Sequence, residues 1–238
     1  MDVPIIIVPY RNRREHVEEW VRVMRMLLPR DCIIVIAEQS RHGKFNRGAV
    51  LNAGFRRALQ LNARRVIFHD CDLIPDMGLA RMYTDPWPSS IVHFGARFNR
   101  YNNTPTYFGG VVGFKVGSFP GFSNLFWGWG GEDDSLYRRV DREAISRPQG
   151  GSYRDLEELH TVKDKLRVLK SYEKCMNKRE LLREDDRRRD NHITLEARVR
   201  YGRMLDCEWI LVTPRMSNKC QKDYRARRRT EQHQWCDR

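Results

Sequence analysis

The stretch Pro4-Ile5-Ile6-Ile7-Val8-Pro9-Tyr10 decides the fold. A short, continuous run of β-branched residues is typical of a strand that is covered on both faces of its sheet. A helix is predicted next over residues 14–28, with Asn12 as its N-terminal cap. Three further segments continue the alternation: a strand at 32–37, a helix from Asn46 to about Leu61, and a strand at 65–69. This β-α-β-α-β order predicts the parallel, nucleotide-binding half of an α/β protein.

The pattern loosens after Pro75. Strands are expected at 91–95 and 107–114, a short helix at 132–140, and late strands at 192–200 and 207–212. Residues 156–191 are highly charged and are predicted to form solvated helix or a mobile lid. Neither an internal repeat nor a clean linker interrupts the 238 residues, so a single domain is expected.

Composition restricts the class of protein. With 40% hydrophobic and 32% charged residues, the chain is predicted to be globular and not disordered. No run approaches the roughly 18–20 apolar residues that span a bilayer, and no secretion signal opens the sequence. The chain as given is therefore expected to be cytoplasmic, without a membrane span, and a monomer is favoured.

The formal net charge of +13 predicts affinity for polyanions, such as nucleic acid, a membrane surface or a diphosphate substrate. Much of this charge lies in residues 163–189 and 225–229, which are predicted to be solvated or mobile segments. A nucleic-acid-binding protein is the alternative of a different class, and it predicts steeply salt-dependent binding. That alternative leaves the loop rich in Trp and Gly at 127–131 without a role, so no nucleic acid is expected.

Asp70-Cys71-Asp72 follows the third predicted strand. In an extended chain, Asp70 and Asp72 point the same way, so both can face one ligand. A carboxylate here can hold a hard divalent cation, which neutralises a nucleotide diphosphate as the sugar leaves. The alternative is a pair of turn or capping carboxylates before Pro75.

Trp127-Gly128-Trp129-Gly130-Gly131-Glu132-Asp133-Asp134 combines indole rings, glycines and three carboxylates. Flat indole faces suit sugar rings, glycines allow close backbone approach, and a carboxylate can accept a proton from an acceptor hydroxyl. The alternative is a helix N-terminus whose dipole favours acidic residues, and both readings can hold together.

His160 is a candidate metal ligand, although a single histidine is more often structural or exposed. Glu157 lies three residues earlier, so on one helical turn both side chains can face one cation. At the ligand edge of the sheet, Arg11, Arg13 and Arg47 can pair with phosphate, and Tyr10 or Phe45 can contact a base or ribose. The alternative for each arginine is an ordinary surface residue.

Six segments, taken in order, resemble the β-1,4-galactosyltransferase family of inverting glycosyltransferases. They are Pro9-Tyr10-Arg11-Asn12-Arg13, residues 45–55 (FNRGAVLNAGF), His69-Asp70-Cys71-Asp72-Leu73-Ile74-Pro75, Tyr107-Phe108-Gly109-Gly110, residues 126–134 (FWGWGGEDD), and Ser146-Arg147-Pro148. The resemblance implies a GT-A fold with a Rossmann-like half and a mixed sheet, UDP-galactose as donor, and Mn²⁺ as cofactor. It also implies transfer to a glycan acceptor in β-1,4 linkage. UDP-GalNAc or UDP-glucose is the alternative donor.

The resemblance also assigns roles to residues. Asp72 and His160 fall at its metal ligands, Asp133 at its catalytic base, and Tyr107 at a position that favours galactose over N-acetylgalactosamine. The donor side is then expected to comprise Pro9, Tyr10, Arg11, Arg13, Phe45, Arg47, Asp70, Tyr107, Trp129 and Glu132. The acceptor side is expected to comprise Trp129, Gly131, Asp133 and Asp134.

The chain departs from the family at Glu157, where better-known members have Met or another non-acidic residue. A carboxylate is a harder ligand than a thioether, so Mg²⁺ is expected to serve nearly as well as Mn²⁺. Short likenesses at 69–70, 137–139 and 204–207 favour the branch that acts on xylose, with glucose and GlcNAc as other acceptors.

The resemblance divides the single domain into parts. A UDP-binding half is expected at 1–75, the donor and acceptor site at 76–160, the charged lid at 156–191, and C-terminal strands with a basic tail at 192–238. The Golgi lumen is the expected location if the chain is a trimmed catalytic domain.

Overall fold

The computed structural model describes residues 3–41, 43–101, 104, 106–187, 197–216, 221–222 and 224–226. Ten strands and six α-helices lie in these ranges. The strands are β1 Ile5–Tyr10, β2 Ile34–Gln39, β3 Arg65–His69, β4 Leu73–Pro75, β5 Ile91–Val92, β6 Val111–Lys115, β7 Ile145–Ser146, β8 Tyr153–Asp155, β9 Ala197–Met204 and β10 Cys207–Pro214. The helices are α1 Arg14–Leu27, α2 Arg47–Gln60, α3 Met77–Thr84, α4 Glu132–Arg139, α5 Val162–Val168 and α6 Lys178–Arg187.

Eight strands form one mixed sheet in the order β7-β5-β6-β3-β1-β2-β10-β9. Strand β1 runs parallel to both β2 and β3, as its continuous apolar sequence predicts. Strands β6 and β9 pair antiparallel with β3 and β10, which makes the sheet mixed. The expected α/β class with a mixed central sheet is confirmed. Strands β4 and β8 form a separate two-stranded sheet.

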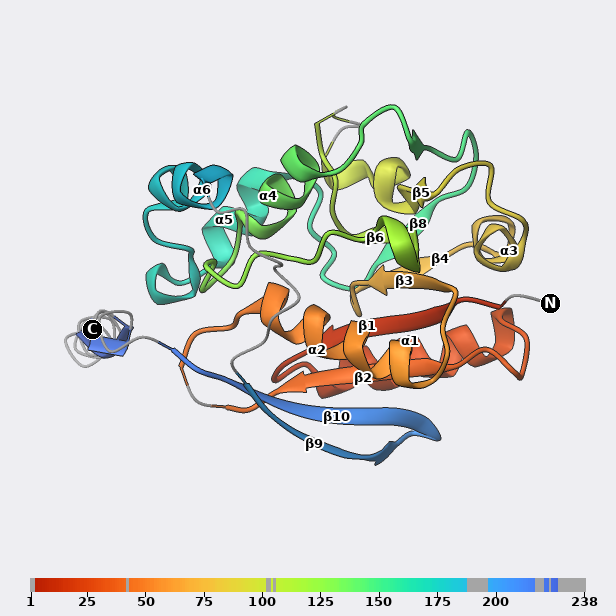
Figure 1. Ribbon diagram of the computed structural model, residues 1–238, viewed down its shortest axis with the longest axis horizontal. Helices are drawn as coiled ribbons and strands as arrows, with labels where there is room; N and C mark the ends of the chain where they lie inside the picture. Colours follow the sequence, from red (N-terminus) through yellow and green to blue (C-terminus); the bar gives the residue numbers. More distant parts are fainter. Residues whose placement is uncertain are drawn as a thin grey trace.

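Both faces of β1 are buried, each in a different hydrophobic cluster. Ile6 and Val8 pack with the α1 cluster that includes Trp20, while Ile5 and Ile7 belong to the cluster that contains residues of α2. Because side chains alternate along a strand, one apolar run supplies both layers. The carboxyl ends of β1 and β2 point toward the side of the molecule where α4, α5 and α6 lie (Figure 1).

The structure corrects several local expectations. Asn12 does not cap α1; it has a positive φ of 54°, and Arg13 occupies the N-cap position without a side-chain cap. The strand expected at 91–95 stops at Val92, where a 3₁₀ helix, Phe94–Arg97, begins. The strand expected at 107–114 begins only at Val111, because the backbone of Gly110 has a φ of 71° that extended strand does not allow.

Asn46 does cap α2, since its side chain accepts a hydrogen bond from the Ala49 amide. The charged segment 156–191 forms α5 and α6, so its predicted helical character is confirmed; its mobility stays a prediction. Of the late elements, residues 192–196 and most of the basic tail fall outside the described residues. No helix in the described part of the chain has the length and apolar character needed to cross a bilayer.

Gly54 of α2 lies directly against β1. A Cβ placed on Gly54 would lie 2.3 Å from Ile7 Cγ2, and Ile7 belongs to a buried hydrophobic cluster. We therefore expect Gly54→Ala to lower the free energy of unfolding by about 1–3 kcal/mol through overpacking, measured by urea denaturation. Gly117→Ala is the matched control, because a Cβ there would meet nothing within 4 Å; equal stability losses in the two variants would contradict this packing.

Candidate active site

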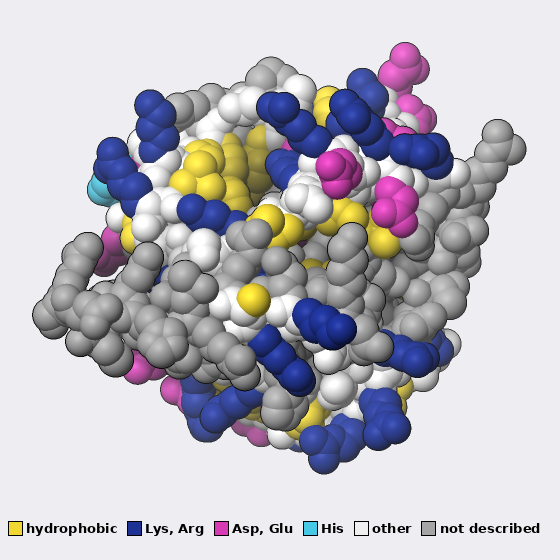
Figure 2. All heavy atoms as spheres, turned by 90° about the vertical axis from the view of Figure 1, so that its left-hand side faces the viewer, with side chains coloured by type: hydrophobic (Ala, Val, Ile, Leu, Met, Phe, Trp, Pro, Cys, Tyr) yellow, Lys and Arg dark blue, Asp and Glu magenta, His cyan; other side chains and the backbone are white. Residues whose placement is uncertain are grey.

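The candidate site lies beyond the carboxyl ends of β1, β2 and β3, where ligands bind in open α/β sheets. Three loops meet there: residues 10–13, 39–47 and 70–72. Figure 2 views the molecule from this side, and it shows a hollow with hydrophobic side chains on its floor and Lys and Arg side chains around it. The loops contact one another, since Arg11 donates to the Gly43 carbonyl and Arg47 donates to Asp70.

Arg47, the first residue of α2, joins two carboxylates that are far apart in sequence. Its guanidinium donates to Asp70 Oδ1 from Nη2 at 2.8 Å and to Asp133 Oδ1 from Nη1 at 2.9 Å. Glu132 Oε1 lies 3.6 Å from the same Nη1. The Arg47 side chain is only 13% exposed, so this is a partly buried ionic contact, and Arg47 is not an ordinary surface arginine.

The three consecutive acids diverge because they open α4, and successive helix residues point in different directions. Glu132 and Asp133 face Arg47, whereas Asp134 turns outward to Lys178 of α6, at 2.5 Å. Gly131 caps the helix with a φ of 108°, and a Cβ there would lie 2.3 Å from the Phe126 ring. The expected helix N-terminus with acidic residues in its first turn is confirmed, and the catalytic role of these acids stays a prediction.

Burial shifts the titration of these carboxyl groups. Loss of solvent raises the pKa of Asp133 to about 8, although the Arg47 guanidinium acts in the opposite direction. Burial also raises the pKa of Glu132, and Glu132 Oε2 has no hydrogen-bond partner among the described residues. A buried acceptor of this kind is suited to a hydroxyl of a bound ligand.

The proposed nucleotide side is formed by the ends of β1 and β2. Arg11 donates from Nη1 to the Gly43 carbonyl at 2.7 Å, and its guanidinium lies over the Phe45 ring at 5.3 Å. Pro9 and Tyr10 are buried at the end of β1. Arg11 and Phe45 thus lie together, as predicted, and place a cationic and an aromatic group at one edge, whereas Tyr10 is buried in the core.

The Trp-Gly loop is held by backbone contacts on two sides. The Gly128 amide donates to the Phe45 carbonyl at 2.7 Å, and the Trp129 amide donates to the Glu173 carbonyl at 2.7 Å. The Cys175 amide donates a hydrogen bond to the Trp129 carbonyl at 3.0 Å. The charged segment therefore contacts the loop that carries Trp129, close to the site.

Tyr107 lies beside the acids of α4. A Cβ on Gly109 would approach both Asp133 Oδ2 and the Tyr107 ring, at 2.3 and 3.0 Å. The ring of Tyr101 stacks on that of Tyr107, with centroids 3.7 Å apart and planes 9° from parallel. Because Gly109 has no side chain, the Tyr107 ring and the Asp133 carboxylate can both pack against its backbone.

Asp72 belongs to a second acidic group, formed with Asp155 and Glu157. Carboxylate oxygens of the three lie within 4.8 Å of one another. Pairing of β4 with β8 creates this group, because Leu73 lies opposite Asp155 and the Leu156 amide donates to the Asp72 carbonyl at 2.7 Å. Three hard oxygen donors at this spacing fit a divalent cation such as Mn²⁺ or Mg²⁺.

The side chains of Asp70 and Asp72 contact different arginines. Strand β3 ends at His69, and a turn follows in which the Leu73 amide donates to the Asp70 carbonyl. Asp70 turns to Arg47, while Asp72 Oδ2 lies 3.4 Å from Arg13 Nη1. The expectation of an extended segment in which both side chains point the same way is therefore wrong, because Asp72 lies in this turn.

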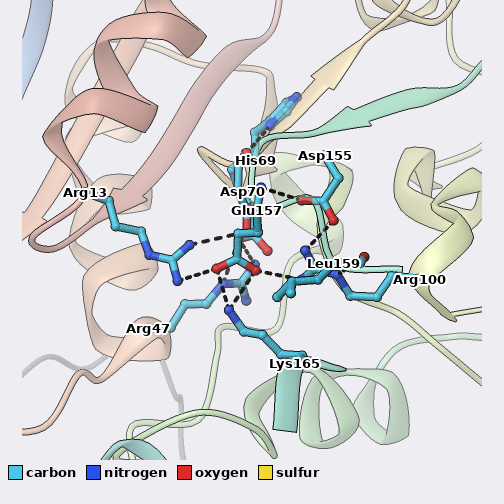
Figure 3. A network of polar contacts seen from close by, with 10 residues as sticks. Arg13, Arg47, His69, Asp70, Arg100, Asp155, Glu157, Leu159 and Lys165 are labelled. Carbon is cyan, nitrogen blue, oxygen red and sulfur yellow. Dashed lines mark hydrogen bonds and ion pairs between the residues drawn. The ribbon is translucent and has the colours of Figure 1, made fainter. Parts of the chain in front are cut away.

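Three cations surround Glu157, as Figure 3 shows. Arg13 Nη2, Lys165 Nζ and Arg100 Nη1 lie 2.5, 2.6 and 2.9 Å from its oxygens. Burial by itself would raise the pKa of Glu157, but Arg13 and Lys165 outweigh it and lower the value to about 2. Glu157 is therefore an anion in this arrangement.

His160 is exposed and does not join the group formed by Asp72, Asp155 and Glu157. Its role as a metal ligand stays a prediction. Sequence reasoning missed Asp155, Arg100, Lys165 and Tyr101, which the structure brings to the site. Only Asp155 had a usable signal, since it lies two residues before Glu157; nothing local marks the other three.

Comparisons with known proteins identify the family and the fold. A family model described as the N-terminal region of glycosyl transferase group 7 matches residues 2–84, and one described as the N-terminal domain of galactosyltransferase matches residues 90–163. Mouse β-1,4-galactosyltransferase 5 is 36% identical over 169 residues, which are 65% of this chain and 43% of the relative. Bovine β-1,4-galactosyltransferase 1 is 36% identical over 154 residues, 60% of this chain and 38% of the relative.

The chain thus aligns with less than half the length of these relatives. A solved structure of the catalytic domain of Drosophila β-1,4-galactosyltransferase 7 with xylobiose has a TM-score of 0.70 at 22% identity, covering 92% of this chain and 97% of that one. The structure of a mutant of that enzyme with manganese, UDP-Gal and xylobiose has a TM-score of 0.72. These structures support the expected GT-A fold. Because the two family models together match residues 2–84 and 90–163, the chain belongs to the β-1,4-galactosyltransferase family.

Proposed function

We propose that this chain transfers galactose from UDP-galactose to a carbohydrate acceptor in β-1,4 linkage, with inversion at the anomeric carbon. The observation that supports it most directly is the shared contact of Arg47 with Asp70 and Asp133. It places a carboxylate of the Trp-Gly loop beside the edge of the sheet where a nucleotide would bind. A proton acceptor and a leaving-group site adjoin one another in this arrangement, as a single displacement requires.

In this mechanism Asp133 accepts the proton of the acceptor hydroxyl as that oxygen attacks the sugar. Arg47 orients the carboxylate through Oδ1, which leaves Oδ2, above Gly109, for the acceptor. Glu132, with its unpaired buried Oε2, receives a sugar hydroxyl. Trp129 supplies an apolar surface for the sugar rings and helps to exclude water from the donor.

On the other side of the bond that breaks, between the sugar and the diphosphate, Arg11, Arg13 and Phe45 bind the nucleotide diphosphate. A divalent cation held by Asp72, with oxygens from Asp155 and Glu157 or with His160, would supply positive charge to the departing diphosphate. Manganese is the ion bound by the Drosophila neighbour, and an all-oxygen donor set suits Mg²⁺ as well. These assignments divide the proposed site into a nucleotide-binding part and a sugar-binding part, as the resemblance implies.

Acceptor and donor identity are testable by product analysis. Xylose is the first acceptor to test, since the Drosophila neighbour was solved with xylobiose. With UDP-galactose and xylosides, glucosides and GlcNAc glycosides, we expect a product heavier by one hexose, detected by mass spectrometry and assigned as β-1,4 by NMR. Transfer only from UDP-GalNAc or UDP-glucose would contradict the donor, and no transfer from any sugar nucleotide would contradict the function.

The role of Asp133 predicts a specific loss. Asp133→Asn keeps the shape and the contact with Arg47 but removes the proton acceptor, so we expect kcat to fall by about 10²–10⁴-fold, while calorimetry shows unchanged binding of UDP. Asp141→Asn, an exposed carboxylate just beyond α4, is the matched control and should retain full activity. Near-normal turnover of Asp133→Asn would show that another group is the base.

The raised pKa of Asp133, about 8, predicts the pH dependence. A general base acts in its deprotonated form, so kcat/KM should rise with pH through this pKa and level off above it. The measurement is initial rate between pH 6 and 9.5, with the small residual rate of Asp133→Asn expected to lack this step. A rate that is highest at pH 6 and falls as pH rises would contradict the assignment.

A further inference from the structure

The proposed metal site carries its own counter-charges. Asp72, Asp155 and Glu157 contribute three formal negative charges, and Arg13, Arg100 and Lys165 contribute three positive ones within the same network (Figure 3). Every carboxylate of the group touches at least one of these cations. The charges therefore balance before any metal ion or nucleotide is bound.

Two of the three cations have little freedom to leave. The side chains of Lys165 and Arg100 are 6% and 4% exposed, and each is held by Glu157. Arg100 Nη2 also lies 2.5 Å from Asp155 Oδ2. Separating either cation from its partner would leave an uncompensated buried charge, which is strongly unfavourable. Arg13, at 37% exposed, is the cation that can turn away.

A divalent ion that enters this network alone meets positive charge that the protein cannot easily remove. Even with Arg13 turned outward, Lys165 and Arg100 stay against the carboxylates that would bind the ion. Repulsion between unit charges a few ångströms apart is large in a partly buried site. A nucleotide diphosphate brings the missing negative charge, and its oxygens also give Arg13 a bidentate partner.

We propose that this chain binds its divalent cation together with the nucleotide diphosphate and only weakly before it, with Arg13 passing from Glu157 to the diphosphate. This inference rests on the proposed function and concerns the order of binding at the same site. Lys165 acts as a positioning residue, because it holds Glu157 and repels a lone metal ion. By linkage, the metal ion raises affinity for UDP by the same factor as UDP raises affinity for the metal.

Mn²⁺ binding to the full chain can be followed by electron paramagnetic resonance, which detects the free ion. The titration is run with and without UDP and corrected for the Mn²⁺ that UDP binds in protein-free solution. We expect affinity for Mn²⁺ to be at least about tenfold higher with UDP, within the usual range of coupling between sites. Equal affinity with and without UDP would overturn the inference and leave the proposed function intact.

Variants test the charge argument directly. Lys165→Met removes one fixed cation, so it should tighten Mn²⁺ binding without UDP by about tenfold and reduce the coupling. Lys163→Met, an exposed lysine on the same helix α5, is the matched control and should bind like the wild type.

Arg13→Gln should shift Mn²⁺ affinity in the same direction as Lys165→Met, and it is informative if Lys165→Met fails to fold. Unchanged Mn²⁺ affinity in a folded Lys165→Met or Arg13→Gln variant would overturn the inference. Absence of saturable Mn²⁺ binding with and without UDP would instead overturn the metal requirement of the proposed function, and the inference with it.

Discussion

The contact of the Arg47 guanidinium with Asp70 and Asp133 is the interaction on which the site depends. Asp70 follows β3 and Asp133 opens α4, so one arginine connects the nucleotide-binding edge of the sheet to the Trp-Gly loop. Without it, Asp70, Glu132 and Asp133 would be carboxylates held close together in a largely buried place. Their mutual repulsion and desolvation would favour either neutral carboxyl groups or separation of α4 from the sheet.

Ionic contacts of the same kind continue along the edge of the sheet. Arg13 connects Asp72 to Glu157, and Arg100 connects Glu157 to Asp155. Positive and negative groups therefore alternate along this edge instead of forming separate patches. Such an arrangement is preorganised for a ligand that also combines charges, as a metal-bound diphosphate does, because exchange of partners avoids an uncompensated buried charge.

The charged segment after Glu157 has a larger structural part than its composition suggests. Helix α6 packs on α4, where Asp185 accepts a hydrogen bond from the Ser135 hydroxyl, and Lys178 pairs with Asp134. Lys165 of α5 is buried against Glu157. Residues that read as a solvated face in the sequence thus help to fix both the helix that carries the proposed base and the acidic group beside it.

The sequence by itself determined the alternating strands and helices of the first 69 residues, the start of a helix at Asn46, and the acids and glycines of the 127–134 loop. These follow from short-range rules of burial, periodicity and capping. Only the tertiary structure decided which charges meet. The partners Arg13 and Asp72, Arg47 and Asp133, and Arg100 and Asp155 are separated by 59, 86 and 55 residues. Sheet order and the β4–β8 pairing bring such groups together, and burial then selects the pairs that neutralise one another.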